Sequence, residues 1–502
     1  MKILKTLIWL MAIGFMSASM LVSCIDDENF AEGSDVSLSF SADTLKFDTV
    51  FTQMGSLTKQ ILVYNKESKA IKINSIRLGG GSASFFRINV DGDASSVVRD
   101  VEIRAKDSMY IFVKVTVNPT NQNNPLLIAD SIILNYNNKN QAIFLQAYGQ
   151  DAYYHLPTDT LLSFNGADTT FIPISFAHND LSSQGIIANG TYLTMKSDKP
   201  HIILGTYAVD SLYHLSIEAG CKIHFGTQAS LWIYRNATIN VGGSQNDPVI
   251  FQGIRTDGLY ATSTGQWDRI WIWTGSNNNS ISDAIIRNGT IGILIDSSAT
   301  DTPNLQLKNV RIENMAFYGI YAQEAHLVAG NLIVTNCGRY CVALNIGGKY
   351  QFVHSTIANY GSAESTSASA GVLLNNYYID ANNTMQIRQI EQADFINTII
   401  YGSKQEQITI DKADESSVLN YSFRNCLLRT QVLTPQSPNI FSCIFNSDPL
   451  FIDVNKGDFG VSAGSPAIGA GDSYYSLAYP TDIYGYPRYY VPTIGAIEYQ
   501  SK

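Results

Sequence analysis

Ionisable side chains suited to cleaving a polysaccharide are scattered over the second half of the chain. Hydrolysis of a glycosidic bond needs two carboxyl groups flanking that bond, and elimination needs a basic side chain beside the proton that is removed. The candidate carboxylates are Asp283, Glu313, Glu391 and Asp394, and the candidate bases are Arg287, Lys308, Arg311 and Arg339. A surface carboxylate on a strand is more often solvated than catalytic, so no catalytic residue is assigned from the sequence.

Three tryptophans in one short segment are the first candidates for binding a sugar. Trp267, Trp271 and Trp273 occupy positions of the same parity, which places them on one face of a continuous β-strand. Exposed aromatic faces stack on sugar rings and bury their apolar C–H surface. The alternative is that these side chains fill a wide core, which is the more common use of large aromatics.

Histidines and cysteines predict neither a nucleophile nor a metal centre. His354 has no second histidine near it in the sequence, so we expect it to pack in a turn or in the core. No Cys/His spacing resembles a zinc site. Cys337 and Cys341 either form a disulfide or serve as small buried apolar side chains, and the second reading is favoured. Five cysteines follow position 24, namely Cys221, Cys337, Cys341, Cys426 and Cys443. Disulfide pairing within the chain would therefore leave at least one of them unpaired.

A repeat positions these side chains. A small polar residue precedes a short apolar strand at six places: Asp283, Asn309, Asn331, Ser355, Asn397 and Asn425. Neighbouring members are 22 to 28 residues apart, except for 42 residues between Ser355 and Asn397. Such a period predicts a solenoid of stacked coils, with residues 360–389 as an inserted loop. We expect Asn309, Asn331, Asn397 and Asn425 to form a hydrogen-bonded ladder, which Asp283 and Ser355 interrupt.

The region before the repeat is all-β. Residues 36–152 contain short alternating strands separated by turn clusters, which indicates a β-sandwich. With Val63-Tyr64-Asn65 and the strand at 71–73, it resembles the immunoglobulin-like domains of the ASPM–SPD2–Hydin type, which are usually spacers or protein-contact modules. Residues 153–210 are interpreted as a connecting segment.

The repeat body, residues 211–446, resembles a right-handed parallel β-helix of the pectate-lyase-like superfamily. The carboxyl-terminal region, residues 447–502, carries Asp448-Pro449-Leu450-Phe451, Ser465-Pro466-Ala467-Ile468-Gly469 and a stretch from Asp482 to Arg488. This ordered string resembles the end of bacterial β-helix surface proteins of the choice-of-anchor Q kind. We expect it to cap the last coil, whose unpaired strand edges would otherwise promote aggregation.

The amino terminus predicts export. Lys2 and Lys5 precede an apolar run over 6–22, and Cys24 follows where that run ends, as in a signal peptide spanning 1–23. The cleavage region resembles a bacterial lipobox, which implies lipidation of Cys24 and attachment to a membrane. The acidic linker at 24–35 resembles the surface-export signal of Bacteroidetes lipoproteins, so we expect an outer-membrane protein that faces the cell exterior.

Composition and resemblance leave three functions open. The net charge of -10 without a basic block argues against nucleic-acid binding. Relatives of the β-helix superfamily include lyases with Ca²⁺-binding carboxylates and an Arg or Lys base, and hydrolases with paired aspartates and a Gly-His-Gly. Here Asp26-Asp27 is the only Asp-Asp and no Gly-His-Gly occurs. We favour non-catalytic binding of glycan or protein by a monomeric surface lipoprotein that needs no cofactor. The alternatives are a lyase or hydrolase, for which Ca²⁺ would be expected only if it is a lyase, and a structural or adhesive protein.

Overall fold

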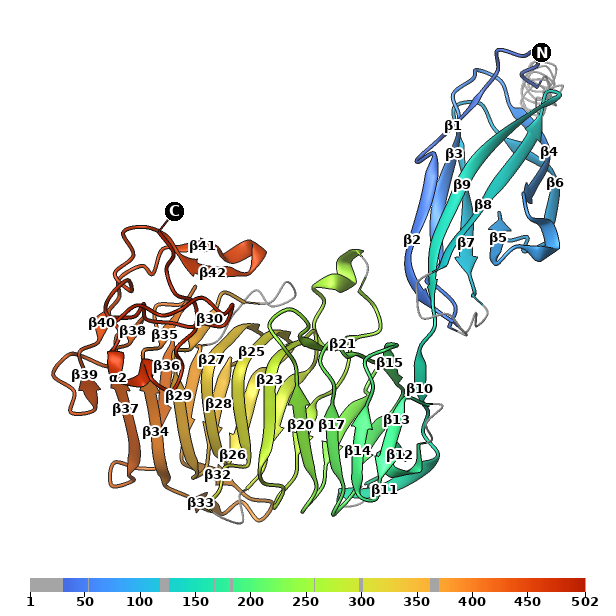
Figure 1. The fold of residues 1–502 in the computed structure, drawn as a ribbon. Helices are drawn as coiled ribbons and strands as arrows, with labels where there is room; N and C mark the ends of the chain where they lie inside the picture. Colours follow the sequence, from blue (N-terminus) through green and yellow to red (C-terminus); the bar gives the residue numbers. More distant parts are fainter. Residues whose placement is uncertain are drawn as a thin grey trace, which may run out of the picture. The chain divides into compact units, whose positions relative to one another are not determined.

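The computed structural model describes residues 30–501, apart from 53, 118–125, 166–167, 181–183, 257, 298–300 and 362–369. The predicted signal peptide, Cys24 and the acidic cluster after it lie outside the described residues. The chain is almost entirely β-structure and divides into two compact units, Met1–Asp151 and Ala152–Lys502 (Figure 1). None of the described helices is long and apolar enough to cross a membrane.

The first unit consists of two sheets around one apolar core. The four-stranded sheet has the order β1-β3-β7-β5, from β1 (Leu38–Phe40), β3 (Lys59–Asn65), β5 (Phe86–Val90) and β7 (Ser108–Val115). The five-stranded sheet has the order β2-β9-β8-β4-β6, from β2 (Thr44–Phe51), β4 (Ile71–Leu78), β6 (Val97–Ile103), β8 (Leu126–Tyr136) and β9 (Lys139–Gln150). A short helical turn, η2 (Gly81–Ala83), precedes β5.

Alternation of apolar and polar side chains along these strands explains the two-layer arrangement. Ile61, Val63, Ile111 and Val113 of one sheet point into the same core as strands of the other sheet, while their neighbours along the chain face outward. The described end of the predicted acidic linker also belongs to this unit, because Ala31 is buried and its N–H donates to the Ala70 carbonyl at 2.7 Å.

The second unit is built from long parallel sheets. A 19-stranded sheet and a 10-stranded sheet share most of its strands. The larger sheet contains β10 (Tyr153–His155), β13 (Ile186–Asn189), β14 (Tyr192–Met195), β15 (His201–Ile203), β17 (His214–Ile217), β18 (Lys222–Phe225), β20 (Thr238–Gly242), β21 (Val249–Gly253), β23 (Asn279–Arg287), β25 (Leu305–Met315), β27 (His326–Cys337), β29 (Lys349–Val353), β30 (Thr356–Asn359), β34 (Ile390–Ile396), β35 (Ile399–Gly402), β37 (Leu419–Arg424), β38 (Leu427–Leu428), β39 (Ile440–Phe441) and β40 (Ile444–Phe445). The smaller sheet contains β11 (Asp159–Asn165), β12 (Asp168–Phe176), β16 (Thr206–Val209), β19 (Ser230–Ile233), β22 (Ile270–Ile272), β24 (Ile291–Ile295), β26 (Tyr318–Gln323), β28 (Val342–Asn345), β31 (Val372–Asn375) and β36 (Ile408–Asp411).

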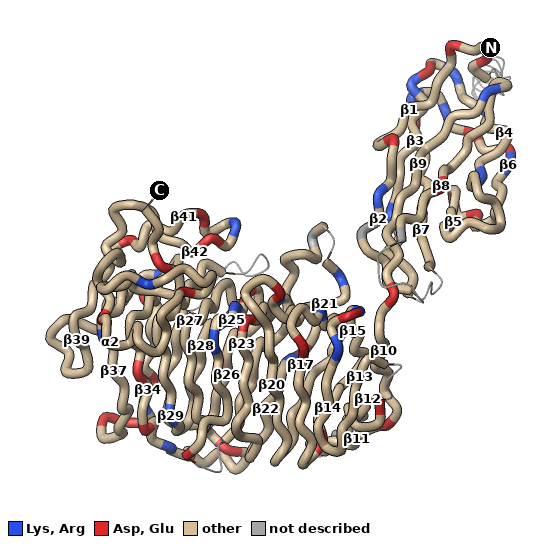
Figure 2. Tube along the Cα trace, in the orientation of Figure 1, with Lys and Arg blue, Asp and Glu red and all other residues tan. Residues whose placement is uncertain are grey.

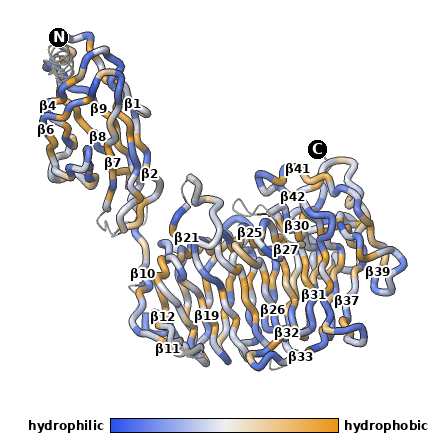
Figure 3. Tube along the Cα trace, turned by 180° about the vertical axis from the view of Figure 1, so that it is seen from behind, coloured by the Kyte–Doolittle hydropathy of each residue, from blue (hydrophilic) through white to orange (hydrophobic). Residues whose placement is uncertain are grey.

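Each turn of the chain contributes three strand segments, two to the larger sheet and one to the smaller. One such coil is β17, β18 and β19, and each of these pairs in parallel with its counterpart in the next coil, β20, β21 and β22. In β23, β25 and β27 the first two segments join into one long bent strand. The arrangement is consistent with a parallel β-helix, whose core runs along the stack. Figure 3 shows hydrophobic positions recurring along these strands.

The stack begins earlier than the sequence indicated. Residues 153–210 were expected to be a connecting segment, but β14, β15 and β16 pair in parallel with β17, β18 and β19. These three strands are the first full coil. They were not recognised as a coil because β15 and β16, with three and four fully buried residues, show no alternation. The 42-residue spacing likewise holds more than a loop, since it includes coil strand β31 and a hairpin of β32 (Tyr377–Ile379) and β33 (Met385–Ile387).

Residues at the bend between the two segments of the larger sheet have left-handed backbones. Asp283, Asn309, Asn331, Asn397 and Asn425 all have φ between 49° and 55°, a region that Asn and Asp tolerate better than other side chains. The ladder prediction contained one register error. The pairing of Gly330 with Val353 and of Ile333 with Thr356 aligns His354, not Ser355, with Asn331, and His354 has φ 49°.

The carboxyl-terminal region packs along the flank of the stack. Its regular elements are β41 (Phe451–Asp453), η6 (Val454–Lys456), β42 (Asp458–Val461) and α2 (Ser473–Ser476). Apolar side chains of this region cover outward-facing residues of β27, β30, β35 and β38, among them Ile333, Ile399 and Leu427. These contacts run across several coils, whereas we had expected the region to close the end of the last coil. Its role as an end cap stays a prediction.

Candidate functional site

The strongest candidate for a ligand-binding surface is an aromatic platform on the outer face of the 10-stranded sheet. We define the platform as Tyr234, Trp271 and Trp273, with Trp232 beneath them. Parallel register places Trp232 of β19 beside Trp271 of β22, so both side chains leave the sheet on the same side. Trp232 is buried, and the other three are half-buried.

The rings of the platform hold each other in place. The Trp271 and Trp273 rings are stacked, with centroids 4.3 Å apart and planes 24° from parallel. Trp232 meets the Trp271 ring edge-on at 5.1 Å, and Tyr234 lies 5.2 Å from Trp273. These contacts hold the rings in fixed orientations before a ligand binds. Binding therefore costs little additional side-chain entropy.

Polar groups border the platform. The indole N–H of Trp271 donates to Asp296 Oδ2 at 2.7 Å, and Gln323 Nε2 donates to Asp296 Oδ1 at 3.3 Å. Burial raises the pKa of Asp296, against the lowering effect of these two hydrogen bonds and of Arg269. The Arg269 guanidinium lies 6.0 Å from the Trp271 ring and is held by both carboxylate oxygens of Asp268 at 2.8 Å. Carboxylate, amide and guanidinium groups thus lie beside an aromatic surface.

One of the three predicted tryptophans is not part of this surface. Trp267 is fully buried, stacks on Phe225 at 4.5 Å inside the coils, and donates its indole N–H to the Arg287 carbonyl at 2.9 Å. The prediction assumed one continuous strand over 267–273. Instead β22 begins at Ile270, and Trp267 makes only an isolated bridge to Gly289, so the parity of side chains changes between Trp267 and Trp271.

The sequence interpretation missed two members of the platform and its carboxylate. Trp232 and Tyr234 alternate in Ser230-Leu231-Trp232-Ile233-Tyr234, and the same i, i+2 signal that drew attention to Trp271 and Trp273 would have found them. Asp296 had no sequence signal, because its proximity to Trp271 depends on the register between two coils 25 residues apart.

The candidate carboxylates do not assemble into one site. Asp283 accepts from Asn309 Nδ2 at 3.0 Å within the ladder, and burial raises its pKa. Glu313 is paired with Arg311 at 2.6 Å. Glu391 and Asp394 lie on β34, three coil strands beyond β25, which is roughly 14 Å along the stack at the usual strand spacing.

The candidate bases are also mostly engaged. Arg287 donates to Gln252 Oε1 through Nε at 2.9 Å and through a second nitrogen at 2.5 Å, and Arg339 donates to the Tyr318 hydroxyl at 3.3 Å. Lys308 is exposed on β25. Arg287, Arg311 and Glu313 do share the outward face of β23 and β25, since Arg287 is the register partner of Glu313.

The ladder side chains form hydrogen bonds along the stack, and three of them also bind the carboxyl-terminal region. Asn331 Nδ2 donates to Asn309 Oδ1 at 2.9 Å. Asn331 and Asn397 also bind carboxyl-terminal groups: Asn331 accepts from Arg488 at 2.7 Å, and Asn397 exchanges two hydrogen bonds with the Asp472 backbone. Asn425 donates to the Ala470 carbonyl at 3.1 Å. His354 is buried, as predicted, and accepts from Asn397 Nδ2 at 3.2 Å, and burial lowers its pKa to about 2.

A buried histidine cluster lies where the residues before the first full coil, His155 of β10 and Asp180, meet His201 and Tyr207 of that coil, and it had no sequence prediction. His155 lies 2.6 Å from Asp180 Oδ2 through Nδ1 and 2.8 Å from His201 Nδ1 through Nε2. The Tyr207 hydroxyl donates to the same Asp180 oxygen at 2.7 Å. Burial, with the neighbouring His155, lowers the pKa of His201 to about 3. Because His155, His201 and Tyr207 are completely buried, this cluster closes the interior of the coil instead of meeting a ligand.

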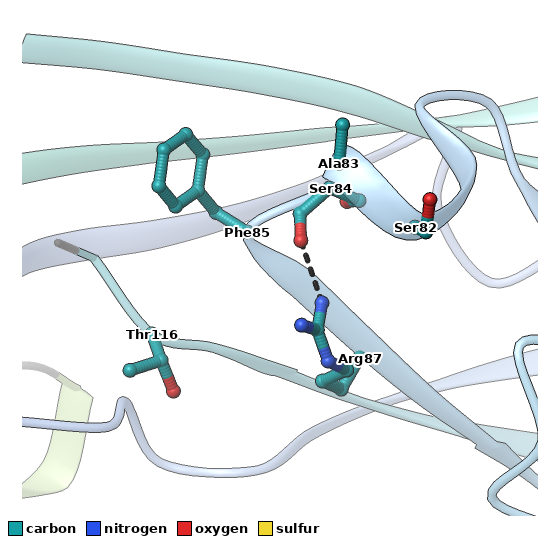
Figure 4. Close-up of a pocket in the computed structure, with 6 residues that line it drawn as sticks. All are labelled: Ser82, Ala83, Ser84, Phe85, Arg87 and Thr116. Carbon is teal, nitrogen blue, oxygen red and sulfur yellow. Dashed lines mark hydrogen bonds between the residues drawn. The ribbon is translucent and has the colours of Figure 1, made fainter.

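The remaining candidates are a metal centre and a hollow in the first unit. Within the described ranges, no three His, Cys, Asp or Glu side chains cluster as metal ligands would. A hollow of about 520 Å³ in the first unit is lined by Ser82, Ala83, Ser84, Phe85, Arg87 and Thr116 (Figure 4). Arg87 is its one ionisable lining residue, and it donates to the Ser84 carbonyl at 2.6 Å.

Comparison with known proteins adds little. No family profile and no curated protein matches the sequence. Among solved structures, the catalytic unit of a GH87 α-1,3-glucanase from Streptomyces thermodiastaticus is similar at 10% identity and a TM-score of 0.21, over 77% of this chain and 87% of that one. A family 123 glycoside hydrolase from Clostridium perfringens has 10% identity and a TM-score of 0.19, over 25% of this chain and 29% of the hydrolase. A protein of unknown function from Porphyromonas gingivalis has 12% identity and a TM-score of 0.17, over 25% and 62%. This chain therefore spans less than two thirds of the last two proteins.

Proposed function

We propose that this protein is a surface lipoprotein that binds glycan without cleaving it, through the aromatic platform. In this proposal Cys24 carries the lipid anchor, and the first unit is an immunoglobulin-like spacer. The second unit is a right-handed parallel β-helix with a choice-of-anchor Q-like end. The single observation that carries the binding proposal is the stacked, half-exposed pair Trp271 and Trp273 beside the carboxylate of Asp296.

The chemistry of the platform matches that of a sugar. A pyranose ring offers an apolar C–H face to an aromatic ring and hydroxyl groups at its rim. Asp296 and Gln323 supply acceptors and donors within reach of that rim. Strands β19, β22 and β26 contain no Lys, Arg, Asp or Glu (Figure 2), so the charges beside the platform are Asp296 and the Asp268–Arg269 pair, in which each charge is opposed by the other. A neutral glycan therefore fits this face better than a polyanion.

The test is binding of the full-length protein to a panel of immobilised glycans, followed by calorimetry with each glycan that binds. Replacing Trp271 and Trp273 by alanine should lower affinity by at least tenfold, because two stacking faces are lost. Tyr490→Ala, which removes a strongly exposed aromatic far from the platform in sequence, is the matched control and should bind normally. Equal binding by both variants would refute the platform as the site.

Glycan cleavage is the second candidate, because Arg287, Arg311 and Glu313 share one outward face. The same glycans are incubated with the protein, with and without Ca²⁺, and assayed for new reducing ends and unsaturated sugar ends. Product that disappears in Glu313→Gln or Arg287→Ala would replace the binding proposal with an enzymatic one. Our expectation is that no product forms and that both variants still bind glycan.

A further inference from the structure

Two cysteines in neighbouring coils lie side by side at the carboxyl-terminal end of the stack. Cys426 precedes β38 and Cys443 precedes β40, and these strands pair in parallel with Leu427 opposite Ile444. The Ile444 N–H donates to the Cys426 carbonyl at 2.8 Å. Cys426 and Cys443 are therefore register partners, one coil apart. Neighbouring strands are about 4.8 Å apart, which lies within the range of Cα separations that a disulfide spans.

The two thiols differ in accessibility and in pKa. Burial, with the neighbouring Cys443, raises the pKa of Cys426 well above its ordinary value, whereas the neighbouring Cys426 thiol lowers the pKa of Cys443. Cys426 is fully buried, whereas Cys443 is half-buried. An accessible sulfur of lowered pKa next to a buried thiol is the arrangement in which one cysteine attacks an external disulfide and the other resolves it.

We infer that Cys426 and Cys443 form an intramolecular disulfide that fastens the last coil to the one before it. The oxidant is an external disulfide. The Cys443 thiolate attacks one of its sulfurs, breaks that S–S bond and releases one thiolate. Cys426 then loses its proton to the released thiolate and attacks Cys443 Sγ, which releases the second thiolate. This thiolate takes up the proton that Cys443 had lost to solvent. Two cysteine thiols and one external disulfide thus become one protein disulfide and two external thiols.

The location explains what such a bond would do. The last coil has a neighbour on one side only, so half of the strand pairing that holds an interior coil is missing. The strands of this coil, β39 and β40, and the strand β38 that pairs with β40 are also the shortest in the stack, with two residues each. A covalent link across one coil limits fraying where hydrogen bonding is weakest. Cys221 lies in another coil and is fully buried, which makes it a suitable control.

The experiment treats the purified full-length protein with oxidised glutathione, unfolds it in denaturant with iodoacetamide, and identifies alkylated and linked peptides by mass spectrometry. We expect Cys426 and Cys443 to escape alkylation, to be recovered as one linked peptide, and to be released by a reductant. Oxidation should raise the Tm by several degrees, and Cys221→Ser should respond in the same way.

Cys443→Ser provides the second measurement. Serine is better tolerated at the half-buried position 443 than at the fully buried position 426. In this variant Cys426 should be alkylated after oxidation, and oxidation should no longer raise the Tm. Complete alkylation of both cysteines in the oxidised wild-type protein would overturn the inference. So would recovery of Cys443 only as its glutathione adduct, or a linkage of either cysteine to a different partner.

Discussion

Replacing Arg488 by alanine should loosen the carboxyl-terminal region from the flank of the stack. Arg488 and Glu498 form an ion pair at 3.4 Å in which both side chains are completely inaccessible to solvent. Arg488 also donates to Asn331 Oδ1 at 2.7 Å, which joins the region to the ladder. Burial lowers the pKa of Arg488 to about 10 and raises the pKa of Glu498. Neither charge is therefore well solvated without its partner.

The magnitude follows from what the substitution leaves behind. Alanine strands a buried carboxylate, and breaking a buried pair in this way costs about 3–5 kcal/mol. Thr493 retains hydrogen bonds to Glu498, so the lower end of that range is expected. Since about 1.4 kcal/mol corresponds to a factor of ten, the opened state of the region should become about 100-fold more populated.

Native-state hydrogen exchange of amides in β41 and β42 measures this population directly. The matched background is Glu498→Gln, which removes the charge but keeps a hydrogen-bonding side chain. In that background Arg488→Ala should accelerate exchange far less, because no carboxylate is stranded. Acceleration below threefold in the wild-type background, or equal acceleration in both backgrounds, would refute the reasoning.

Three further outcomes are expected. Asn397→Ala should destabilise the protein by about 3–4 kcal/mol. Two lost hydrogen bonds to Asp472 contribute about 1 kcal/mol each, and the left-handed backbone costs an alanine about 1–2 kcal/mol. Urea unfolding should show Asn397→Gly to be less harmful. In Gly330→Ala the new Cβ would lie 2.0 Å from the Tyr479 ring, so the free energy of unfolding should fall by about 1–3 kcal/mol. When Tyr479 is already alanine, adding Gly330→Ala should not lower the free energy of unfolding further. Stability should fall as the pH drops below about 6.5, because burial keeps three histidines neutral when folded and lowers their pKa to about 3, 4 and 2: His201, His224 and His354. Each binds a proton more readily when unfolded, which removes about 2 kcal/mol per histidine by pH 5, and a Tm that does not change between pH 7 and pH 5 would contradict this.

The sequence predicted most of the repeat because the bend of each coil requires one residue with a left-handed backbone conformation. A left-handed backbone selects Asn or Asp, and that selection is visible as a period of 22 to 28 residues. The same reasoning failed at His354, because here a histidine and not Asn or Asp adopts the left-handed conformation. A one-residue shift to Ser355 then looked like a better match to the pattern than the true register.

Features that depend on contacts between distant coils were beyond prediction. Trp267 faces inward because it lies before β22, which begins at Ile270, and nothing in the local alternation marks that boundary. Asp296 and Asp180 acquire their neighbours only when particular coils are stacked. The carboxyl-terminal motif string led to the prediction of an end cap. The path of this region along the flank is set by apolar residues such as Ile333 and Ile399, which local patterns assign to strands alone.

The path of the carboxyl-terminal region has a consequence for cooperativity. In an ordinary solenoid each coil touches only its neighbours, so the ends can unravel one coil at a time. Here one segment holds Arg311 through the Gly457 carbonyl, Asn331 through Arg488, and Asn397 through Asp472. Peeling away the last coil therefore does not free the coils beneath it, and these coils should unfold together as a single block.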